Sequence, residues 1–265
     1  MLRHTSSLEG FPWAIRCAGF VALCFAIVIN LLLRPRLPPR KGGPIIEWAA
    51  FREPPYVLFA IGMFLIFWAL YFGFFYVGLG TLLKPAWRRQ LDVSQLNTFA
   101  RKTIGFSDLA SINLLLISNA VGIPIRPLLG YISDRWCGPI NLFVPLSAIL
   151  GLVIYCWMAV TTRAESYAFA VVYGLATAAV QGIFVGALAS LTKDLSKTGT
   201  RFGMVCSILA FATLTGPPIA GALIENDGGG YRTAQIWGGT VILLGSLTVG
   251  AARVYETGLR VRIKM

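Results

Sequence analysis

Residues Asn119–Asn141 read NAVGIPIRPLLGYISDRWCGPIN, and the interpretation of the whole chain starts from them. The first half of this stretch lies in a long apolar run, yet it holds Arg126 between two prolines. The second half leaves the apolar run through an Asp134-Arg135 pair. A cation and helix breakers at membrane depth cost free energy unless protein or water surrounds them. The stretch therefore indicates a substrate or ion pathway inside a membrane-spanning helix.

The composition agrees with a membrane protein, because 56% of the 265 residues are hydrophobic and 13% are charged. The mean hydropathy is +0.71. A helix needs about 20 apolar residues to cross a bilayer, and a membrane β-barrel would show a shorter alternating pattern. We therefore predict an all-α membrane protein with seven transmembrane helices. The apolar stretches are Phe11–Leu33, Tyr56–Gly80, Leu109–Ile132, Ile140–Val160, Tyr167–Leu191, Phe202–Ile224 and Ile236–Val254.

One loop divides these seven stretches unequally. Residues Arg34–Pro55 are basic and rich in proline, so they cannot continue a helix. We predict a single transmembrane helix in residues 1–33 and a cytoplasmic loop in residues 34–55. A first three-helix repeat is expected in residues 56–160, and a second repeat with a cytoplasmic tail in residues 161–265.

The basic residues predict the orientation of the chain. The net charge is +12, but most cations lie in loops between spans, so we expect no nucleic-acid partner; the predicted partner is the lipid bilayer. Of the 23 Lys and Arg residues, 13 fall on the side of the Arg34–Pro55 loop and 8 on the opposite side. Because cytoplasmic loops carry the excess of basic residues, this bias predicts a cytoplasmic C-terminus.

Arg126 is the main candidate for substrate binding. Asn119 lies seven residues earlier, which returns it to nearly the same helix face, and Gln181 lies in the fifth apolar stretch. A guanidinium in a polar patch with these side chains could hold a carboxylate through two hydrogen bonds. The alternative is that Arg126 extends along the helix to the headgroups and binds nothing.

Gly130, Asp134 and Arg135 form a candidate gating latch where the third apolar stretch ends. A contact made by this pair in one access state would break in the other. The alternative is a solvated surface pair, which contributes little to stability.

Glycine and proline residues indicate where helices approach one another closely. The sequence GIFVG places Gly182 and Gly186 four residues apart, and Gly216, Pro217 and Gly221 lie in the sixth apolar stretch. Small residues let two helix backbones come together, so we predict that these positions form packing seams.

Cysteine and histidine usage gives no support for a metal site or a cofactor. The five cysteines have no paired spacing, and the chain has one histidine. We expect unpaired cysteines that act as small buried hydrophobic residues. No cluster of acid, base and nucleophile suggests an enzyme.

Together, the segments of this chain resemble fungal members of the monocarboxylate porter family within the major facilitator superfamily. The segments that carry the resemblance are GFPWAIRCAGF (Gly10–Phe20), LLLRPRLPPRKGGPIIEW (Leu31–Trp48), FREPPYVLF (Phe51–Phe59), TIGFSDLASINLLLISNAVGIPIR (Thr103–Arg126), YISDRWCGPINLFVP (Tyr131–Pro145), GTRFGM (Gly199–Met204) and LTGPPIAGALI (Leu214–Ile224). The resemblance implies half of a twelve-helix bundle, namely helix six, the central loop and helices seven to twelve. Five N-terminal helices would then be missing, and residues 80–97 look inserted, which a gene-model error would explain.

The resemblance also implies a function: alternating-access transport of a small organic solute, with an anionic monocarboxylate as one candidate. In that family an arginine at the position of Arg126 is associated with the substrate anion. Some members have an aspartate one turn earlier, where this chain has Gly122. The implied location is the plasma membrane or the vacuolar membrane. The alternative function is a truncated, non-transporting membrane protein that assembles with or regulates a partner.

Overall fold

The computed structural model describes residues 6–33, 46–78, 108–192 and 194–258. Most of the predicted Arg34–Pro55 loop and the predicted insertion at residues 80–97 lie outside these ranges. The described chain divides into two units, residues Met1–Pro44 and residues Ile45–Met265. The first unit contains one helix, α1 (Ser6–Leu32), whose apolar part is Arg16–Leu32.

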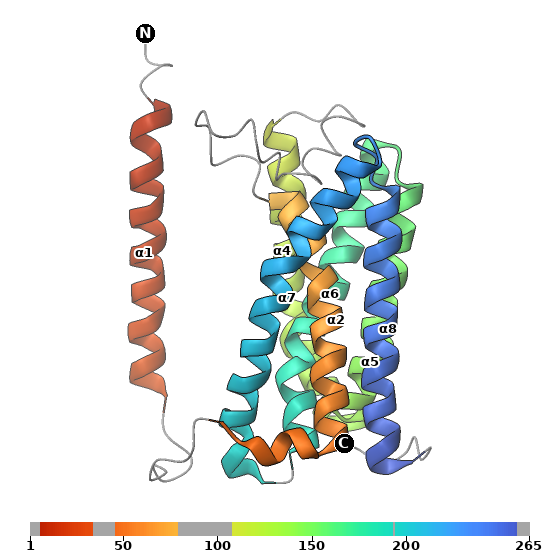
Figure 1. Cartoon of the computed structure of the whole chain (residues 1–265). Helices are drawn as coiled ribbons and strands as arrows, with labels where there is room; N and C mark the ends of the chain where they lie inside the picture. The colour runs from red at the N-terminus through yellow and green to blue at the C-terminus, as the bar shows by residue number, and fades with distance from the viewer. Residues whose placement is uncertain (1–5, 34–45, 79–107, 193, 259–265) are drawn as a thin grey trace. The chain divides into compact units, whose positions relative to one another are not determined.

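The described part of the second unit forms a bundle of six long helices, accompanied by short helical turns (Figure 1). The long helices are α2 (Pro54–Gly78), α4 (Asp108–Ile132), α5 (Pro139–Cys156), α6 (Arg163–Leu191), α7 (Thr198–Asn226) and α8 (Arg232–Thr257). The short turns are η1 (Trp48–Arg52), η4 (Ser133–Cys137), η5 (Trp157–Ala159) and η6 (Leu195–Lys197). Each predicted apolar stretch of this unit coincides with one long helix.

Six helices among the described residues are long and apolar enough to cross a membrane. All six belong to the second unit, and the apolar part of α1 is shorter than theirs. The all-α, multi-pass membrane architecture is therefore confirmed at the level of six spans. The seventh span, in α1, stays a prediction.

Consecutive long helices of the bundle run in opposite directions (Figure 1). As a result η1, η4, η6 and the end of α8 lie at one end of the bundle, which we call the η1 end. Five described basic residues that the charge count assigned to one side belong to elements at this end: Arg52, Arg135, Lys197, Arg201 and Arg253.

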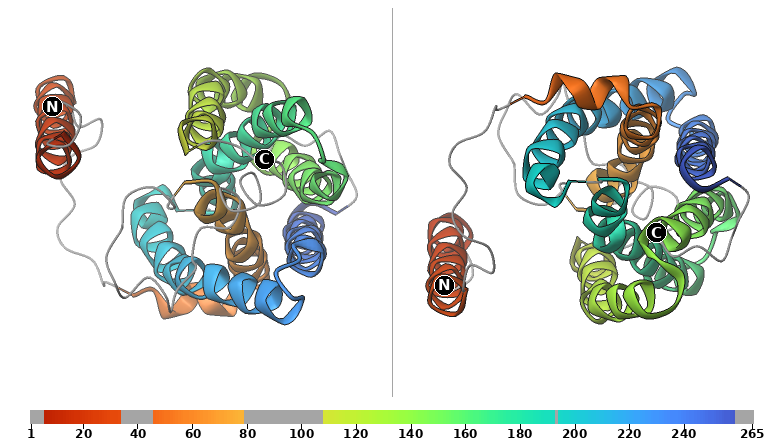
Figure 2. Two further views of the ribbon diagram at one scale, coloured as in Figure 1. Left: turned by 90° about the horizontal axis from the view of Figure 1, so that it is seen from above. Right: turned by 90° about the horizontal axis from the view of Figure 1, so that it is seen from below.

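The predicted first repeat contributes α2, α4 and α5, and the second contributes α6, α7 and α8. Each helix of the first set packs mainly against helices of the second: α2 against α8 and α7, α4 against α6, and α5 against α8 and α6. Views along the bundle show α2 and α6 near its centre (Figure 2). These two helices are also the most buried spans, whereas α4 is the least buried.

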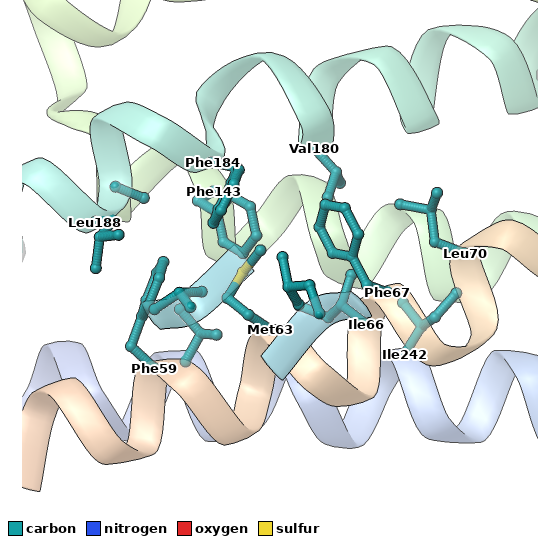
Figure 3. Packing of buried hydrophobic residues seen from close by; sticks show 14 of the residues in the cluster. Phe59, Met63, Ile66, Phe67, Leu70, Phe143, Val180, Phe184, Leu188 and Ile242 are labelled. Carbon is teal, nitrogen blue, oxygen red and sulfur yellow. The ribbon is translucent and has the colours of Figure 1, made fainter. Parts of the chain in front are cut away.

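Buried side chains of α2 fill the middle of the bundle (Figure 3). Phe59, Met63 and Ile66 are completely buried, and the Phe67 ring lies 5.6 Å from the ring of Phe184 on α6. The protein interior and lipid are both apolar, so the buried and the outward sides of α2 can both carry apolar residues. Phe67 is part of this core.

The contact between α4 and α6 is built from small residues spaced by one helical turn. On α6 these are Gly174, Ala178 and Gly182. A Cβ atom added to Gly174 would lie 2.3 Å from the backbone oxygen of Ser118 on α4. The α4 and α6 backbones can approach this closely because glycine has no side chain to separate them.

Other predicted packing residues also lie against neighbouring helices. Gly186 faces Pro139 of α5, and Gly216 faces the backbone oxygen of Trp68 on α2. Pro217 is buried next to Gly216, inside an α7 that continues to Asn226, and Gly221 is half-buried. The indole of Trp68 donates a hydrogen bond to Thr215 Oγ1 at 3.0 Å, beside the contact at Gly216.

All five cysteines are free, but four of them are exposed: Cys17, Cys24, Cys137 and Cys156. The expectation that they would be buried was wrong. In a membrane protein a small apolar residue can face lipid as well as core, because lipid chains are as apolar as the protein interior.

Substitution of Gly216 tests the α2–α7 contact. An added Cβ atom would lie 2.0 Å from the Trp68 backbone oxygen, so the helices would have to separate. We expect Gly216→Ala to destabilise the bundle by about 1–3 kcal/mol, the usual cost of overpacking. The measurement is the thermal unfolding of the detergent-solubilised protein.

Gly203→Ala is the matched control in the same helix, because nothing lies within 4 Å of a Cβ atom there. It should stabilise α7 by up to about 1 kcal/mol through helix propensity. Equal melting temperatures for the two variants would contradict the proposed contact.

Candidate functional site

Arg126 on α4 and Gln181 on α6 are hydrogen-bonded to each other. Arg126 Nη2 donates to Gln181 Oε1 at 2.8 Å, and the Arg126 side chain is exposed. A Cβ atom added to Gly182 would lie 3.2 Å from Arg126 Cγ. Gly182 therefore leaves the space in which the arginine side chain crosses the surface of α6.

Two prolines shape α4 around Arg126. Pro124 and Pro127 lie inside the helix, which nevertheless continues to Ile132. Because proline has no amide proton, the carbonyl groups of Ala120 and Ile123 lose their usual helical donors. These carbonyls add hydrogen-bond acceptors to the polar patch that contains Arg126.

The guanidinium of Arg126 has capacity for a further partner. Its planar group carries five N–H donors, and Gln181 is a neutral acceptor that cannot balance the positive charge. A carboxylate could pair with the remaining donors through two parallel hydrogen bonds. The arrangement can thus bind an anion while Gln181 holds the arginine in place.

Asn119 lies on the same helix but does not join the Arg126–Gln181 contact. Its Nδ2 atom donates to the backbone oxygen of Leu115 at 2.9 Å, and the side chain is exposed. Seven residues of helix separate Asn119 from Arg126 by about 10 Å along the axis. The sequence placed both residues in one patch, whereas the hydrogen bond of Asn119 keeps it against its own helix.

Gly122 is buried against α6, one turn before Arg126. A Cβ atom added there would lie 2.8 Å from the Cβ atom of Ala178. An aspartate would not fit between the helices unless α4 moved away from α6. The glycine is therefore explained by close helix packing.

The predicted latch residues lie at the η1 end, where α4 continues into the π-helical turn η4. Arg135 Nη1 donates to Tyr131 Oη at 3.1 Å, one turn back in the chain. The Asp134 side chain is exposed, and nothing lies within 4 Å of a Cβ atom added to Gly130. Within the described ranges, no ion pair joins Asp134 to Arg135.

Near the latch residues, hydrogen bonds of Asn141 join the start of α5 to η4 and to α8. Asn141 on α5 donates to the backbone oxygen of Cys137 at 2.8 Å. Its Oδ1 atom accepts a hydrogen bond from Arg253 Nε on α8. This contact connects η4, α5 and α8.

A buried ion network at the η1 end was missed by the sequence analysis. The Arg201 guanidinium on α7 pairs with Glu47 at 3.0 Å and with Glu53 at 2.6 Å, and Lys197 pairs with Glu47 at 2.9 Å. Glu47 is 8% exposed and Arg201 4% exposed. The sequence analysis counted only the basic residues of the Arg34–Pro55 loop, so it did not identify Glu47 and Glu53 as partners for a cation.

Further contacts surround Arg201. Its second contact with Glu53, from Nη1 at 2.7 Å, makes that pair bidentate. The ring of Tyr56 lies 5.5 Å from the Arg201 Cζ atom, and Tyr56 Oη donates to the Arg201 backbone oxygen at 3.2 Å. The network thus joins the segment before α2, the start of α2 and the start of α7.

The ion pairs change the titration of Glu47. The Arg201 guanidinium, and after it the Lys197 ammonium, hold the pKa of Glu47 below its usual value. A carboxylate with a lowered pKa stabilises the fold above its unfolded-state pKa. That stabilisation is lost as the pH falls through the lowered value.

In the part of the chain that the structure describes, no group of three or more His, Cys, Asp or Glu side chains could hold a metal ion.

Arg201→Ala tests the weight of the ion network. Removal of the guanidinium leaves Glu47 buried with only Lys197, and breaking a buried pair from one side costs about 3–5 kcal/mol. We expect a large fall in the thermal unfolding temperature in detergent. Lys197→Ala is the matched control: its side chain is 41% exposed, and exposed pairs contribute about 0–1 kcal/mol. An equally small effect of both variants would show that the network is solvated.

The chain is similar in sequence to proteins that are named as transporters. No family model matches it. It is 34% identical over 254 residues to an MFS-type transporter of Gibberella zeae, covering 96% of this chain and 54% of the relative. It is 30% identical over 250 residues to an aspyridones efflux protein of Emericella nidulans, covering 94% of this chain and 47% of the relative.

A third relative is a fujikurins efflux protein of Gibberella fujikuroi, 27% identical over 266 residues, with 98% of this chain and 52% of the relative covered. The chain thus spans about half the length of the curated relatives that it matches. Together with the six membrane-spanning helices, the similarity supports membership of the major facilitator superfamily.

Proposed function

We propose that this chain forms part of an alternating-access transporter for a small organic solute, and that Arg126 and Gln181 contact the solute. The observation that carries the proposal is the hydrogen bond between these side chains on an exposed face of α4 and α6. Relatives named as MFS-type transporters and efflux proteins support transport as the function.

The energetics of Arg126 support an anionic group on the solute. An arginine at the bilayer centre costs about 2.5–3.5 kcal/mol on insertion scales. Gln181 satisfies one donor but leaves the positive charge unbalanced. A solute carboxylate would balance the charge and use the remaining donors, whereas lipid chains could do neither.

The substrate class that we propose is a small organic acid, either a monocarboxylate or a larger acidic metabolite. Two relatives are named as efflux proteins, which favours export as the direction. We further propose that the chain corresponds to the C-terminal half of such a transporter. The face of α4 and α6 that bears Arg126 would then line one side of the transport path.

The latch remains part of this proposal. Gly130, Asp134 and Arg135 lie where α4 ends, and an added Cβ atom at Gly130 would meet nothing. Packing against the described residues therefore does not explain this glycine. An exposed Asp134 is available for a contact made in another access state.

Arg126→Lys tests the binding role. An ammonium keeps the charge but cannot reproduce the planar fork of donors. Loss of one hydrogen bond to a charged group costs about 1.5–3 kcal/mol, so transport should fall about tenfold or more. The measurement is the movement of radiolabelled lactate and benzoate across membranes of cells that produce the protein from its complete gene.

Arg232→Lys is the control, because Arg232 is an exposed arginine at the opposite end of the bundle. It should leave transport unchanged. Full transport by Arg126→Lys at normal expression would reject the substrate role and favour an arginine that reaches the headgroups.

Orientation is a second prediction. The excess of basic residues in the sequence on the side of the Arg34–Pro55 loop, to which Arg52 at the η1 end belongs, predicts that this end and the C-terminus lie in the cytoplasm. A protease site added after Met265 should be cut only when the cells are permeabilised. Cleavage by protease added outside intact cells would show that the C-terminus faces outward, opposite to the prediction.

A further inference from the structure

The Ile46–Arg52 segment has two different sides. Trp48 is 73% exposed, Ile46 45% and Phe51 42%, so three large apolar side chains point outward. On the inner side Ala50 is completely buried. A surface made of tryptophan, phenylalanine and isoleucine is costly to expose to water, which indicates a partner for it.

The charges of the segment are divided in the same way. Glu47 and Glu53 are the acidic residues in and next to the segment, and both point to Arg201. Arg52 is exposed, whereas the Glu53 carboxylate, whose side chain is 44% exposed, is paired with Arg201. A segment with a formal excess of acidic groups thereby presents an apolar and basic surface.

We propose that this outer surface lies in the headgroup region of the bilayer and binds anionic lipid. Tryptophan prefers the membrane–water interface, and an interfacial helix typically buries its apolar face by about 5–10 Å. The segment ends two residues before the apolar span of α2, which begins at Pro54. Its depth is therefore that of the end of a membrane span, where headgroups are found.

The ion network makes this surface possible. Unpaired glutamates would be repelled by anionic headgroups and would hold the segment in water. Here Arg201 pairs with both carboxylates and Lys197 pairs with Glu47, so each glutamate has a cationic partner in the protein. Because the same network reaches the start of α2 and the start of α7, the lipid contact would fix the height of both helices in the membrane.

The inference requires that the bundle spans a membrane, but it does not require transport. A spin label at Ala49 tests it, because Ala49 is exposed beside Trp48 and its substitution keeps all three apolar side chains. Ala49→Cys is made in a variant with all five native cysteines replaced by alanine, and the whole chain is reconstituted in vesicles. Collision of the label with oxygen, which partitions into lipid, is compared with collision with a water-soluble nickel complex.

Two reference labels define the scale. Leu247→Cys on α8 is an outward, apolar position in the middle of a span, and Ser196→Cys is an exposed position in η6. We expect the ratio of oxygen to nickel accessibility at position 49 to lie between the two and to be several-fold above that at Ser196. It should rise further in vesicles that contain phosphatidylserine in place of part of the phosphatidylcholine.

Removal of the apolar side chains provides the matched comparison. The double variant Trp48→Ala, Phe51→Ala should lower the ratio at position 49 to the Ser196 value. Ile61→Ala, an outward residue on the α2 span, should leave the ratio unchanged. The proposal would be overturned if, with Trp48 and Phe51 still present, the ratio of oxygen to nickel accessibility at position 49 equalled that at position 196.

Two other outcomes would also overturn it. A label shielded from both oxygen and nickel would mean that protein, such as a second copy of this chain, covers the surface. Equal ratios in neutral and anionic vesicles would remove the role of anionic lipid.

Discussion

The bundle depends on close contact between helix backbones. Within a membrane, lipid chains are as apolar as leucine, so the hydrophobic effect does little to bring helices together, and van der Waals packing must do so. Glycine residues supply this packing at three separate interfaces. Gly174 approaches Ser118, Gly216 approaches the backbone of Trp68, and Gly245 approaches the backbone of Gly62. At each interface an added methyl group would meet backbone atoms, which cannot rotate away as a side chain can.

The candidate site is a consequence of one of these interfaces. The seam of small residues on α6 brings α4 close enough for Arg126 to reach Gln181. The same closeness excludes a side chain at Gly122. Packing and the proposed substrate recognition therefore involve the same two helices, and a change in the spacing of α4 and α6 would alter the Arg126–Gln181 contact.

The ion network at the η1 end solves a different physical problem. Four charged groups lie together there, and two of them, Glu47 and Arg201, are buried, which would be very unfavourable for either one alone. Two carboxylates and two cations balance one another, and the bidentate Arg201–Glu53 contact satisfies several donors at once. This arrangement fixes the segment that precedes α2 to the start of α7.

The sequence by itself determined the helical membrane architecture. Apolar stretches of bilayer length can satisfy their backbone groups only as helices, so the six spans of the bundle were predictable nearly to their ends. Arg126 and Gln181 were also identifiable, because polar residues within apolar spans are unusual. The sequence did not reveal that they touch, nor that Asn119 bonds to its own helix.

Only the tertiary structure decided which residues meet across the fold. Glu47 and Arg201 are 154 positions apart, and Arg126 and Gln181 are 55 positions apart. Hydrophobic patterning shows that a segment is a helix and how long it is, but α2 is apolar on every side and offers no preferred face. The neighbours of such a helix are chosen by the shapes of small and large side chains in three dimensions, and that information appears only when the helices are packed.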